Sequence, residues 1–344
     1  MSANDLARLA DAHAFDPFPR REDLAAYHVP FDQLTGQRLV EERLRVGTHR
    51  GHRSVVMGAS GVGKSSVIAY TLGPLEQEVV PFRVSVADEP VATVSDAKAF
   101  VQHLVRTVSL EAQQGALISE ADRSGAVRNA SDNVPVEQRA RTRRWGWASR
   151  VGPELTVEIS STTAPAQMGR STSEVVGQAA RLMELVQAHK LLPVVVIDDA
   201  DAWLALPGGT DRLQVAEVFF GQVLRSIIEL PCALVIAAHH QYKQLAGFQA
   251  CAGLLEFTVE IPRLPDPSAL EQLVDGRVRC HLADRDARVL GMGASERLFD
   301  YYAGPAKTSL RRMLVVLQGA LELASEQGDE LIEERSIEAA HAQI

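Results

Sequence analysis

A glycine-rich stretch near the start of the chain has the residue types and spacing of a phosphate-binding loop. The pattern G-x-x-x-x-G-K-[ST] is met at Gly58, Gly63, Lys64 and Ser65. Glycines allow a tight turn whose successive backbone N–H groups point inward at phosphate oxygens. The lysine can reach the β- and γ-phosphates, and the serine hydroxyl can ligate Mg²⁺. The residues expected to cradle the phosphates are Gly58, Ala59, Ser60, Gly61, Val62, Gly63, Lys64, Ser65 and Ser66.

The segments on both sides of this loop fit the same chemistry. The run "RSVVMG" (53–58) predicts a short buried strand, and "SSVIAYTL" (65–72) has helical spacing. A helix that begins near Lys64 adds the positive end of its dipole to the phosphate site. Because strand, loop and helix follow in the required order, a chance glycine-rich turn is the weaker interpretation. The chain is predicted to bind a nucleoside triphosphate.

Two carboxylates follow a second apolar run, "LLPVVVIDDADAW" (191–203). A continuous apolar strand is typical of the middle of a parallel sheet, and ligands bind at the carboxyl ends of such strands. We assign Asp198 to the Mg²⁺ site, where its carboxylate would hold the ion through water. The residues predicted to bind the metal are therefore Ser65, through its hydroxyl, and Asp198. Asp199 is assigned to the attacking water, a task that a glutamate more often performs. The alternative is an aspartate-rich turn after a strand.

Length and composition indicate an ordinary globular protein. The 344 residues allow one large domain and a smaller one, and the chain is 46% hydrophobic and 23% charged. The net charge of −9 argues against a protein that coats nucleic acid through general charge, although a local basic patch remains compatible with it. No apolar run has the length of a membrane span, and the N-terminus lacks a secretory pattern. We therefore expect a cytoplasmic protein with no membrane association.

The three cysteines, Cys232, Cys251 and Cys280, are scattered and form no C-x-x-C pair. They predict thiols in a reducing cytosol rather than a metal site.

The C-terminal part separates the classes of nucleotide-binding protein. After about residue 265 every segment reads as helix, as in "SLRRMLVVLQGALELASEQG" (309–328), with Gly328 as the stop. A GTPase would need an N-K-x-D or T-K-x-D motif, and an ABC ATPase a second signature resembling L-S-G-G-Q; the sequence contains neither. Nucleoside monophosphate kinases share the phosphate loop but are smaller and lack a long helical C-terminal region.

The two motifs followed by a helical region resemble the AAA+ superfamily, in particular its initiator-like and STAND-related ATPases (origin-recognition proteins, transposition-regulator ATPases and bacterial defence ATPases). The resemblance implies a three-layer α/β/α P-loop domain with a central parallel sheet, followed by a small all-helical lid. The expected divisions are an N-terminal arm (1–52), the ATPase domain (53–265, with an insertion at about 116–172) and the lid (266–344).

The resemblance also implies roles for individual residues. His239, or else His240, stands at the end of the strand "CALVIAAHH" (232–240), where the family senses the γ-phosphate, usually with asparagine, threonine or serine. Arg311, or else Arg312, would reach from the lid to the γ-phosphate. Arg225 would complete a neighbouring subunit's site as an arginine finger. For each of the three positions a simple surface or turn residue is the alternative.

The residues just before the first strand have a further implied role. In such proteins this segment often cradles adenine, and "YHVP" (27–30) is the candidate here. Packing of an N-terminal arm is the alternative, and the sequence favours it.

The predicted insertion contains a cluster of arginines and tryptophans. These residues are Arg139, Arg141, Arg143, Arg144, Trp145, Trp147 and Arg150. Arginines supply phosphate contacts and tryptophans supply stacking surfaces, so the cluster could bind DNA or RNA. Alternating apolar residues in 145–160 also fit a hairpin that contacts a ring neighbour or a protein partner. A solvated loop is the third interpretation, and all three stay open.

These observations predict an ATP hydrolase of the AAA+ type that uses ATP and Mg²⁺. We expect it to couple the nucleotide state to self-assembly and to remodelling or recruitment of a separate protein partner. One alternative is a slow ATP/ADP switch of the STAND kind, which an aspartate at 199 mildly favours. Another is a DNA-associated ATPase that recruits its partner through the arginine and tryptophan cluster. Because no further region follows the predicted lid in this sequence, we expect any DNA contact to come from the ATPase domain itself, or the protein to work with a separately encoded partner.

Overall fold

Five parallel strands form the centre of the fold, in the spatial order β2-β3-β4-β1-β5. Their bounds are β1 Arg53–Gly58, β2 Val79–Ser85, β3 Leu192–Asp198, β4 Ala233–His239 and β5 Phe257–Glu260. The computed structural model describes residues 2–20, 23–36, 39–87, 89–131, 170–205, 212–282, 288–304 and 309–344. The predicted arginine and tryptophan cluster lies outside these residues.

Both faces of the sheet are buried, and the strand residues divide between them with a period of two. In β3, Val194 and Val196 belong to one hydrophobic cluster, whereas Val195 and Ile197 belong to the other. The first cluster continues into the C-terminal helices, and the second lies wholly within the α/β domain. This explains why β3 reads as an unbroken apolar run: each side chain has a helical layer to pack against.

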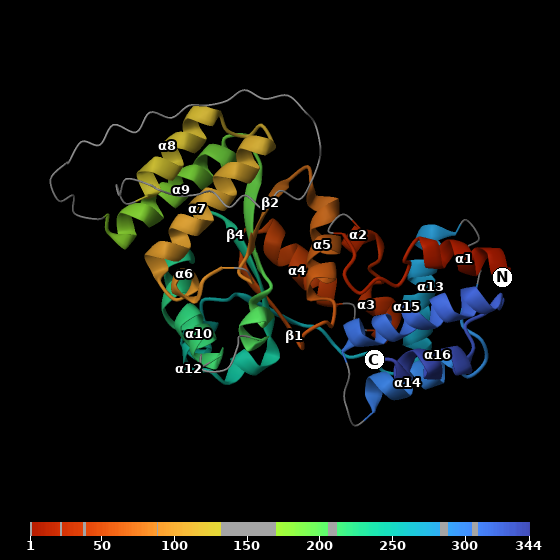
Figure 1. Cartoon of the computed structure of the whole chain (residues 1–344). Helices are drawn as coiled ribbons and strands as arrows, with labels where there is room; N and C mark the ends of the chain where they lie inside the picture. Colours follow the sequence, from red (N-terminus) through yellow and green to blue (C-terminus); the bar gives the residue numbers. More distant parts are fainter. Residues whose placement is uncertain are drawn as a thin grey trace, which may run out of the picture.

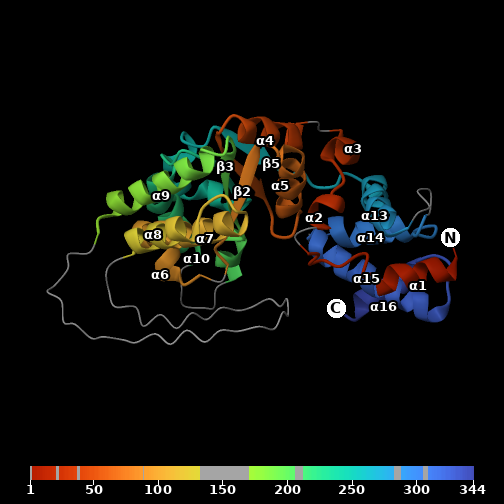
Figure 2. The same ribbon diagram turned by 90° about the horizontal axis from the view of Figure 1, so that it is seen from above.

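Helices cover the two faces of the sheet (Figure 2). Those of the α/β domain and the segment before it are α2 Asp23–Ala26, α3 Phe31–Thr35, α4 Leu39–His49, α5 Lys64–Leu72, α6 Val91–Val94, α7 Ala97–Gln114, α8 Glu120–Ala130, α9 Thr172–Gln187, α10 Arg212–Val218, α11 Leu224–Ile227 and α12 Ala246–Ala252. A π-helical turn, Phe219–Val223, joins α10 to α11, and short 3₁₀ turns span Gly73–Leu75, Ala200–Ala205 and His240–Gln244. Helices α4 and α5 pack on one face; α7, α9 and the α10–α12 group pack on the other. Helix α8 packs on α7 and α9.

The C-terminal helices form a separate bundle beside the sheet (Figure 1). They are α13 Pro267–His281, α14 Ala294–Ala303, α15 Leu310–Gln327 and α16 Glu334–Ala342. The predicted helix signals are present: the Asp266 carboxylate accepts a hydrogen bond from the backbone N–H of Ala269 at 2.9 Å, and Gly328 closes α15 at φ +72°. This bundle is the expected lid.

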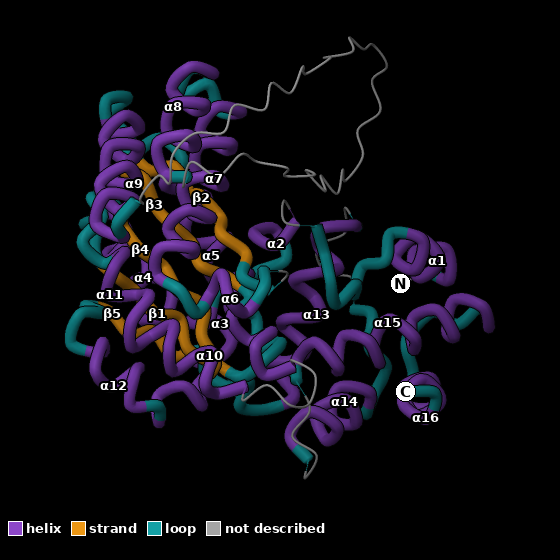
Figure 3. The backbone as a smooth tube through the Cα atoms, turned by 60° about the vertical axis from the view of Figure 1, so that its left-hand side comes forward, coloured by secondary structure: helices purple, strands orange, loops and turns teal. Residues whose placement is uncertain are grey.

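The N-terminal helix α1 (Ala3–Asp11) belongs to the lid rather than to the sheet domain, although it lies far from the lid in sequence. It packs on α15, and Leu6, Leu9 and Phe15 are fully buried in the cluster that the lid shares. Figure 3 shows α1 beside α15, with α2 and α3 between the lid and the sheet. The chain thus crosses from the lid to the α/β domain before the first strand begins.

Within the described ranges, no helix is both long enough and apolar enough to cross a membrane.

Candidate functional site

The predicted phosphate loop connects β1 to α5 at the carboxyl edge of the sheet. Gly61 and Gly63 both have positive φ, +72° and +99°, a conformation that favours glycine. A Cβ on Gly61 would lie 2.7 Å from the Cβ of Arg311, so this glycine also permits close contact with the lid. Helix α5 then begins with Lys64, and the Val67 N–H donates to the Gly63 carbonyl at 3.0 Å. The loop therefore has the strand–turn–helix context that its chemistry requires.

The Lys64 side chain is 7% exposed and folds back over the loop. Its Nζ donates to the carbonyl oxygens of Gly58 at 3.2 Å and Ala59 at 2.8 Å, and forms an ion pair with Asp201 Oδ2 at 2.6 Å. Asp201 lies in the 3₁₀ turn after β3, and the sequence analysis gave it no role. The signal for it was present, since Asp201 is the third aspartate of "DDAD".

Ser65 and Asp198 meet at the predicted metal position. The Ser65 hydroxyl donates to Asp198 Oδ1 at 3.1 Å, and Asp198, the last residue of β3, is 8% exposed. Both are hard oxygen donors of the kind that Mg²⁺ prefers, bound directly or through a water of its coordination shell. The pair fits a Mg²⁺ ion.

Asp199 lies beside this pair in an unusual backbone conformation. Its φ is +62°, which a residue other than glycine seldom adopts. Its side chain is exposed on the cavity side, and the Ser85 hydroxyl, at the end of β2, donates to Asp199 Oδ2 at 3.5 Å. Strain of this kind is often retained at functional sites. The Asp199 carboxylate is therefore accessible to solvent at the edge of the cavity.

His239 ends β4, in register with Gly58, the residue at which the phosphate loop begins. It is 7% exposed, its Nδ1 accepts a hydrogen bond from the Gln241 N–H at 3.2 Å, and its ring stacks on His240 with centroids 4.3 Å apart. Burial lowers the pKa of His239, so the imidazole is neutral at pH 7. His239 does not line the cavity.

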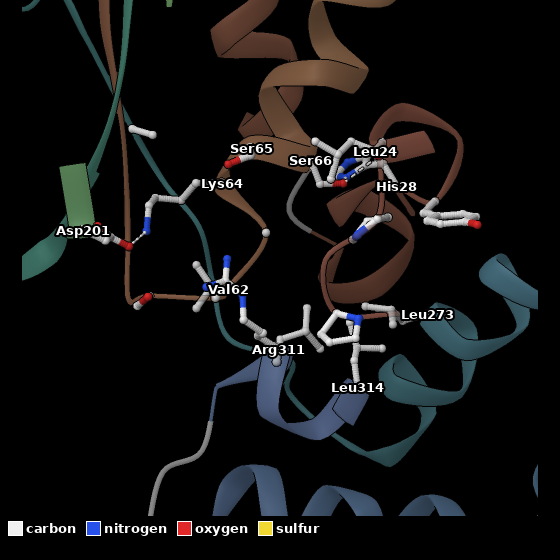
Figure 4. Close-up of a pocket in the computed structure, with 18 of the residues that line it drawn as sticks. Leu24, His28, Val62, Lys64, Ser65, Ser66, Asp201, Leu273, Arg311 and Leu314 are labelled. Atoms are coloured by element: carbon white, nitrogen blue, oxygen red, sulfur yellow. Dashed lines mark hydrogen bonds and ion pairs between the residues drawn. The ribbon is translucent and has the colours of Figure 1, made fainter. Parts of the chain in front are cut away.

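A cavity of about 340 Å³ joins the phosphate loop to the lid. Figure 4 shows Lys64 and Asp201 at one end and Leu273 and Leu314 of the lid at the other. Its remaining walls come from the loop, from the carboxyl end of β3 and from the N-terminal segment. The lining combines apolar side chains with charged and hydroxyl groups, and cavities with placed polar groups are typical of small-molecule sites.

The lid arginine of the prediction lies at this cavity. Arg311 lines it, whereas Arg312, one residue later, does not. The Arg311 backbone N–H donates to the Gly61 carbonyl at 3.1 Å, so the start of α15 is fixed directly to the phosphate loop. Its guanidinium lies over the Phe18 ring, 4.9 Å from the centroid.

The predicted adenine segment also reaches the cavity, through Tyr27, His28 and Val29. It touches both parts of the protein. His28 Nδ1 lies 3.3 Å from the Ser66 hydroxyl of α5, and the Tyr27 hydroxyl lies 2.9 Å from His281 Nε2 of α13. The segment therefore both lines the cavity and packs as an arm, so the two interpretations are compatible.

Arg277 of α13 is a cavity residue that the sequence analysis missed. Its guanidinium lies 5.0 Å from the Tyr27 ring centroid and donates to the Asp16 carbonyl at 2.9 Å. Burial lowers its pKa to about 10, so it is charged at pH 7. The sequence contains no specific signal for Arg277, because a single arginine in an amphipathic helix belongs to no motif.

Arg225 lies away from the cavity, on α11, and donates to the Ala250 carbonyl at 3.2 Å. An arginine finger acts on a neighbouring subunit's site, so this placement leaves the prediction for Arg225 as it was.

No family model matches the chain, and no curated protein matches its sequence. Solved structures do resemble it. The Orc1 protein of Aeropyrum pernix, solved in complex with DNA, matches with a TM-score of 0.51 and 15% identity over 94% of this chain and 69% of that one. Cdc6p from Pyrobaculum aerophilum gives 0.47 and 14% over 95% and 67%, and the Aeropyrum pernix ORC2 protein gives 0.47 and 16% over 89% and 65%.

At these identities the likeness to Orc1 shows the fold. The predicted architecture, an α/β domain with a parallel sheet followed by a helical bundle, is confirmed, and the fold is similar to that of the Orc1 protein.

Proposed function

We propose that the protein binds ATP with Mg²⁺, hydrolyses it, and uses the nucleotide state to control self-assembly and the remodelling or recruitment of a protein partner. One observation carries the proposal: Lys64, Ser65 and Asp198 meet at one end of a cavity that the lid closes at the other. A phosphate loop alone would fit many reactions. The hydroxyl–carboxylate pair beside it supports a metal-bound triphosphate in particular.

Each side chain has a defined task in this reaction. The loop N–H groups and Lys64 neutralise phosphate charge, and Ser65 and Asp198 would hold Mg²⁺, which adds further neutralisation. Asp199 would orient the attacking water, since its carboxylate faces the cavity beside Asp198. Arg311 would approach the γ-phosphate from the lid. Arg311 lines the cavity at the start of α15, so its contact with the γ-phosphate would make the position of the lid depend on which nucleotide is bound.

The contact between the lid and the loop supports a link to assembly. Because Arg311 N–H and Gly61 O are hydrogen-bonded, a change in the loop moves the start of α15. Because α1 packs on α15, the N-terminal helix would move with the lid. The nucleotide would thereby alter a large surface on which a neighbouring subunit or a partner could act.

The test is ATP turnover per subunit as the protein concentration rises, with Lys64→Ala as the blank. If turnover per subunit rises with the concentration of the wild type but stays constant with the concentration of Arg225→Ala, the result would support sites completed between subunits. The matched control is Arg181→Ala, which removes an arginine of α9 that does not line the cavity. No turnover above the blank at any concentration would refute hydrolysis.

A slow ATP/ADP switch is the second candidate, and Asp199 favours it. An aspartate is one methylene shorter than the usual glutamate, and here it is held in a strained conformation with φ +62°. The switch predicts that purified protein retains nucleotide while turnover stays near the Lys64→Ala blank. Release of bound nucleotide on addition of a partner, without hydrolysis, would decide for it.

DNA association is a further proposal, supported by the DNA complex of the similar Orc1 protein. The residues proposed for it, Arg139, Arg141, Arg143, Arg144, Trp145 and Trp147, lie outside the described residues. The test is the affinity for duplex DNA at two salt concentrations, comparing the wild type with a variant in which the four arginines are alanine. Equal affinity for the two proteins would refute this assignment.

A further inference from the structure

The ammonium group of Lys64 has no hydrogen-bonding capacity to spare. A lysine side chain carries three N–H donors and no acceptor. Three acceptors lie within reach of Nζ: the Gly58 carbonyl at 3.2 Å, the Ala59 carbonyl at 2.8 Å and Asp201 Oδ2 at 2.6 Å. A phosphate oxygen that bonds to this ammonium must therefore take the place of one of the three.

The three acceptors differ in how easily they can give way. Gly58 is the last residue of β1, paired with His239 of β4, so its carbonyl is held by the sheet, and the Ala59 carbonyl belongs to the backbone of the loop that follows. Asp201 belongs to a separate element, the 3₁₀ turn Ala200–Ala205, and reaches Lys64 through a rotatable side chain. The carboxylate is thus the acceptor that a phosphate can displace at least cost.

The surroundings of the Asp201 carboxylate make its interaction with Lys64 strong. The Asp201 side chain is 15% exposed and that of Lys64 is 7% exposed, so water screens the pair weakly. The second oxygen, Asp201 Oδ1, is buried and has no hydrogen-bond partner among the residues described. The turn itself is held in place, since the Tyr242 hydroxyl donates to the Ala200 carbonyl at 2.8 Å and Trp203 is 2% exposed.

We propose that Asp201 is a positioning residue that competes with the nucleotide phosphates for Lys64 and thereby sets the affinity of the site. The proposal rests on the proposed function, because it needs a nucleotide at the phosphate loop. In the free protein Asp201 holds Lys64 against the loop carbonyls. On binding, the phosphates take over the ammonium, and the released carboxylate carries the signal into the turn after β3.

This exchange also connects two strand ends of the site. Lys64 follows β1 and Asp201 follows β3. The ion pair between them thus links the phosphate loop to the turn after β3.

The test is the affinity of the full chain for ATP and for ADP, each with Mg²⁺, measured by calorimetry. Asp201→Asn keeps the shape of the side chain and removes its charge. We expect both dissociation constants to fall about tenfold or more, because the phosphates then displace a neutral amide from Lys64 rather than an oppositely charged carboxylate. Asp201→Glu, which keeps the carboxylate, should bind within about threefold of the wild type. If the asparagine variant does not fold, Asp201→Ala carries the same expectation.

Glu260→Gln is the matched control. It removes the same charge from an exposed carboxylate that pairs with Lys243. Its affinity should equal that of the wild type. A gain in affinity confined to the neutral Asp201 variants cannot come from a merely structural role, because lost structure weakens binding.

The outcomes separate the two proposals. Wild-type protein that binds nucleotide, with neutral Asp201 variants that bind equally or more weakly, would overturn the role of Asp201 and leave the proposed function intact. Wild-type protein that binds no nucleotide would overturn the proposed function, and the role of Asp201 with it.

Discussion

Replacing Gly61 with alanine would place a methyl group between the phosphate loop and the lid. At φ +72° a residue with a side chain costs about 1–2 kcal/mol. The new Cβ would also lie 2.7 Å from the Cβ of Arg311 and 3.2 Å from that of Ser309, distances at which the start of α15 must move. Overpacking of this kind costs about 1–3 kcal/mol more. We expect a total loss of about 2–5 kcal/mol.

Gly36→Ala is the control, because it has the same backbone strain without the collision. Gly36 has φ +70°, and a Cβ there would meet nothing within 4 Å. It should cost only the backbone part, about 1–2 kcal/mol. The assay combines denaturant unfolding with ADP titration. Gly61→Ala should lose at least about 1 kcal/mol more stability than Gly36→Ala and bind ADP about tenfold more weakly. Equal stability and equal binding in the two variants would refute the inferred contact between lid and loop.

Three further predictions follow from the site and its surroundings. Ser65→Ala should abolish the gain in ATP affinity that Mg²⁺ gives, while binding without metal changes little; calorimetry with Mg²⁺ or EDTA measures both. Arg311→Ala should lower turnover about tenfold or more, whereas Arg312→Ala, on the same helix but outside the cavity, should keep it. Glu41 tests pH dependence: burial alone would raise the pKa of its carboxyl, but hydrogen bonds from His28 and from the Phe31 N–H lower it below its ordinary 4.5. Since the folded-state pKa is depressed, the carboxylate stabilises the fold above its unfolded pKa, and this contribution is lost as the pH falls through the folded value. Glu41→Gln should therefore flatten the fall in thermal midpoint below about pH 4.5; an unchanged slope would contradict this.

Much of the fold could be predicted from the sequence because its signals are local. The strand at 53–58 and the helix at 267–281 were predicted to within a residue or two, since apolar periodicity and an aspartate N-cap mark them. The sheet order and the packing of α1 on α15 could not be predicted. Both depend on contacts between residues far apart in the sequence: Ser54 of β1 pairs with Phe257 of β5, and Phe15 N–H donates to Gln318 Oε1, 303 positions away.

The candidate site divides in the same way. Lys64, Ser65 and Asp198 form a motif, and the structure brings them together. Asp201 could have been noticed in the acidic run, but its partner lies 137 residues away. Arg277 carries no motif, because its place in the cavity comes from the packing of the lid against the N-terminal segment. The roles assigned to His239, Arg311 and Arg225 stay predictions.

The central claim, that this cavity holds and hydrolyses ATP, is tested most directly by single-turnover hydrolysis of Mg²⁺-bound ATP by wild-type protein and by Lys64→Ala. The account predicts that the wild type binds ATP and converts it to ADP, and that the variant does neither, although it unfolds at a similar temperature. Equal hydrolysis by the two proteins, or no nucleotide binding by a folded wild type, would contradict it.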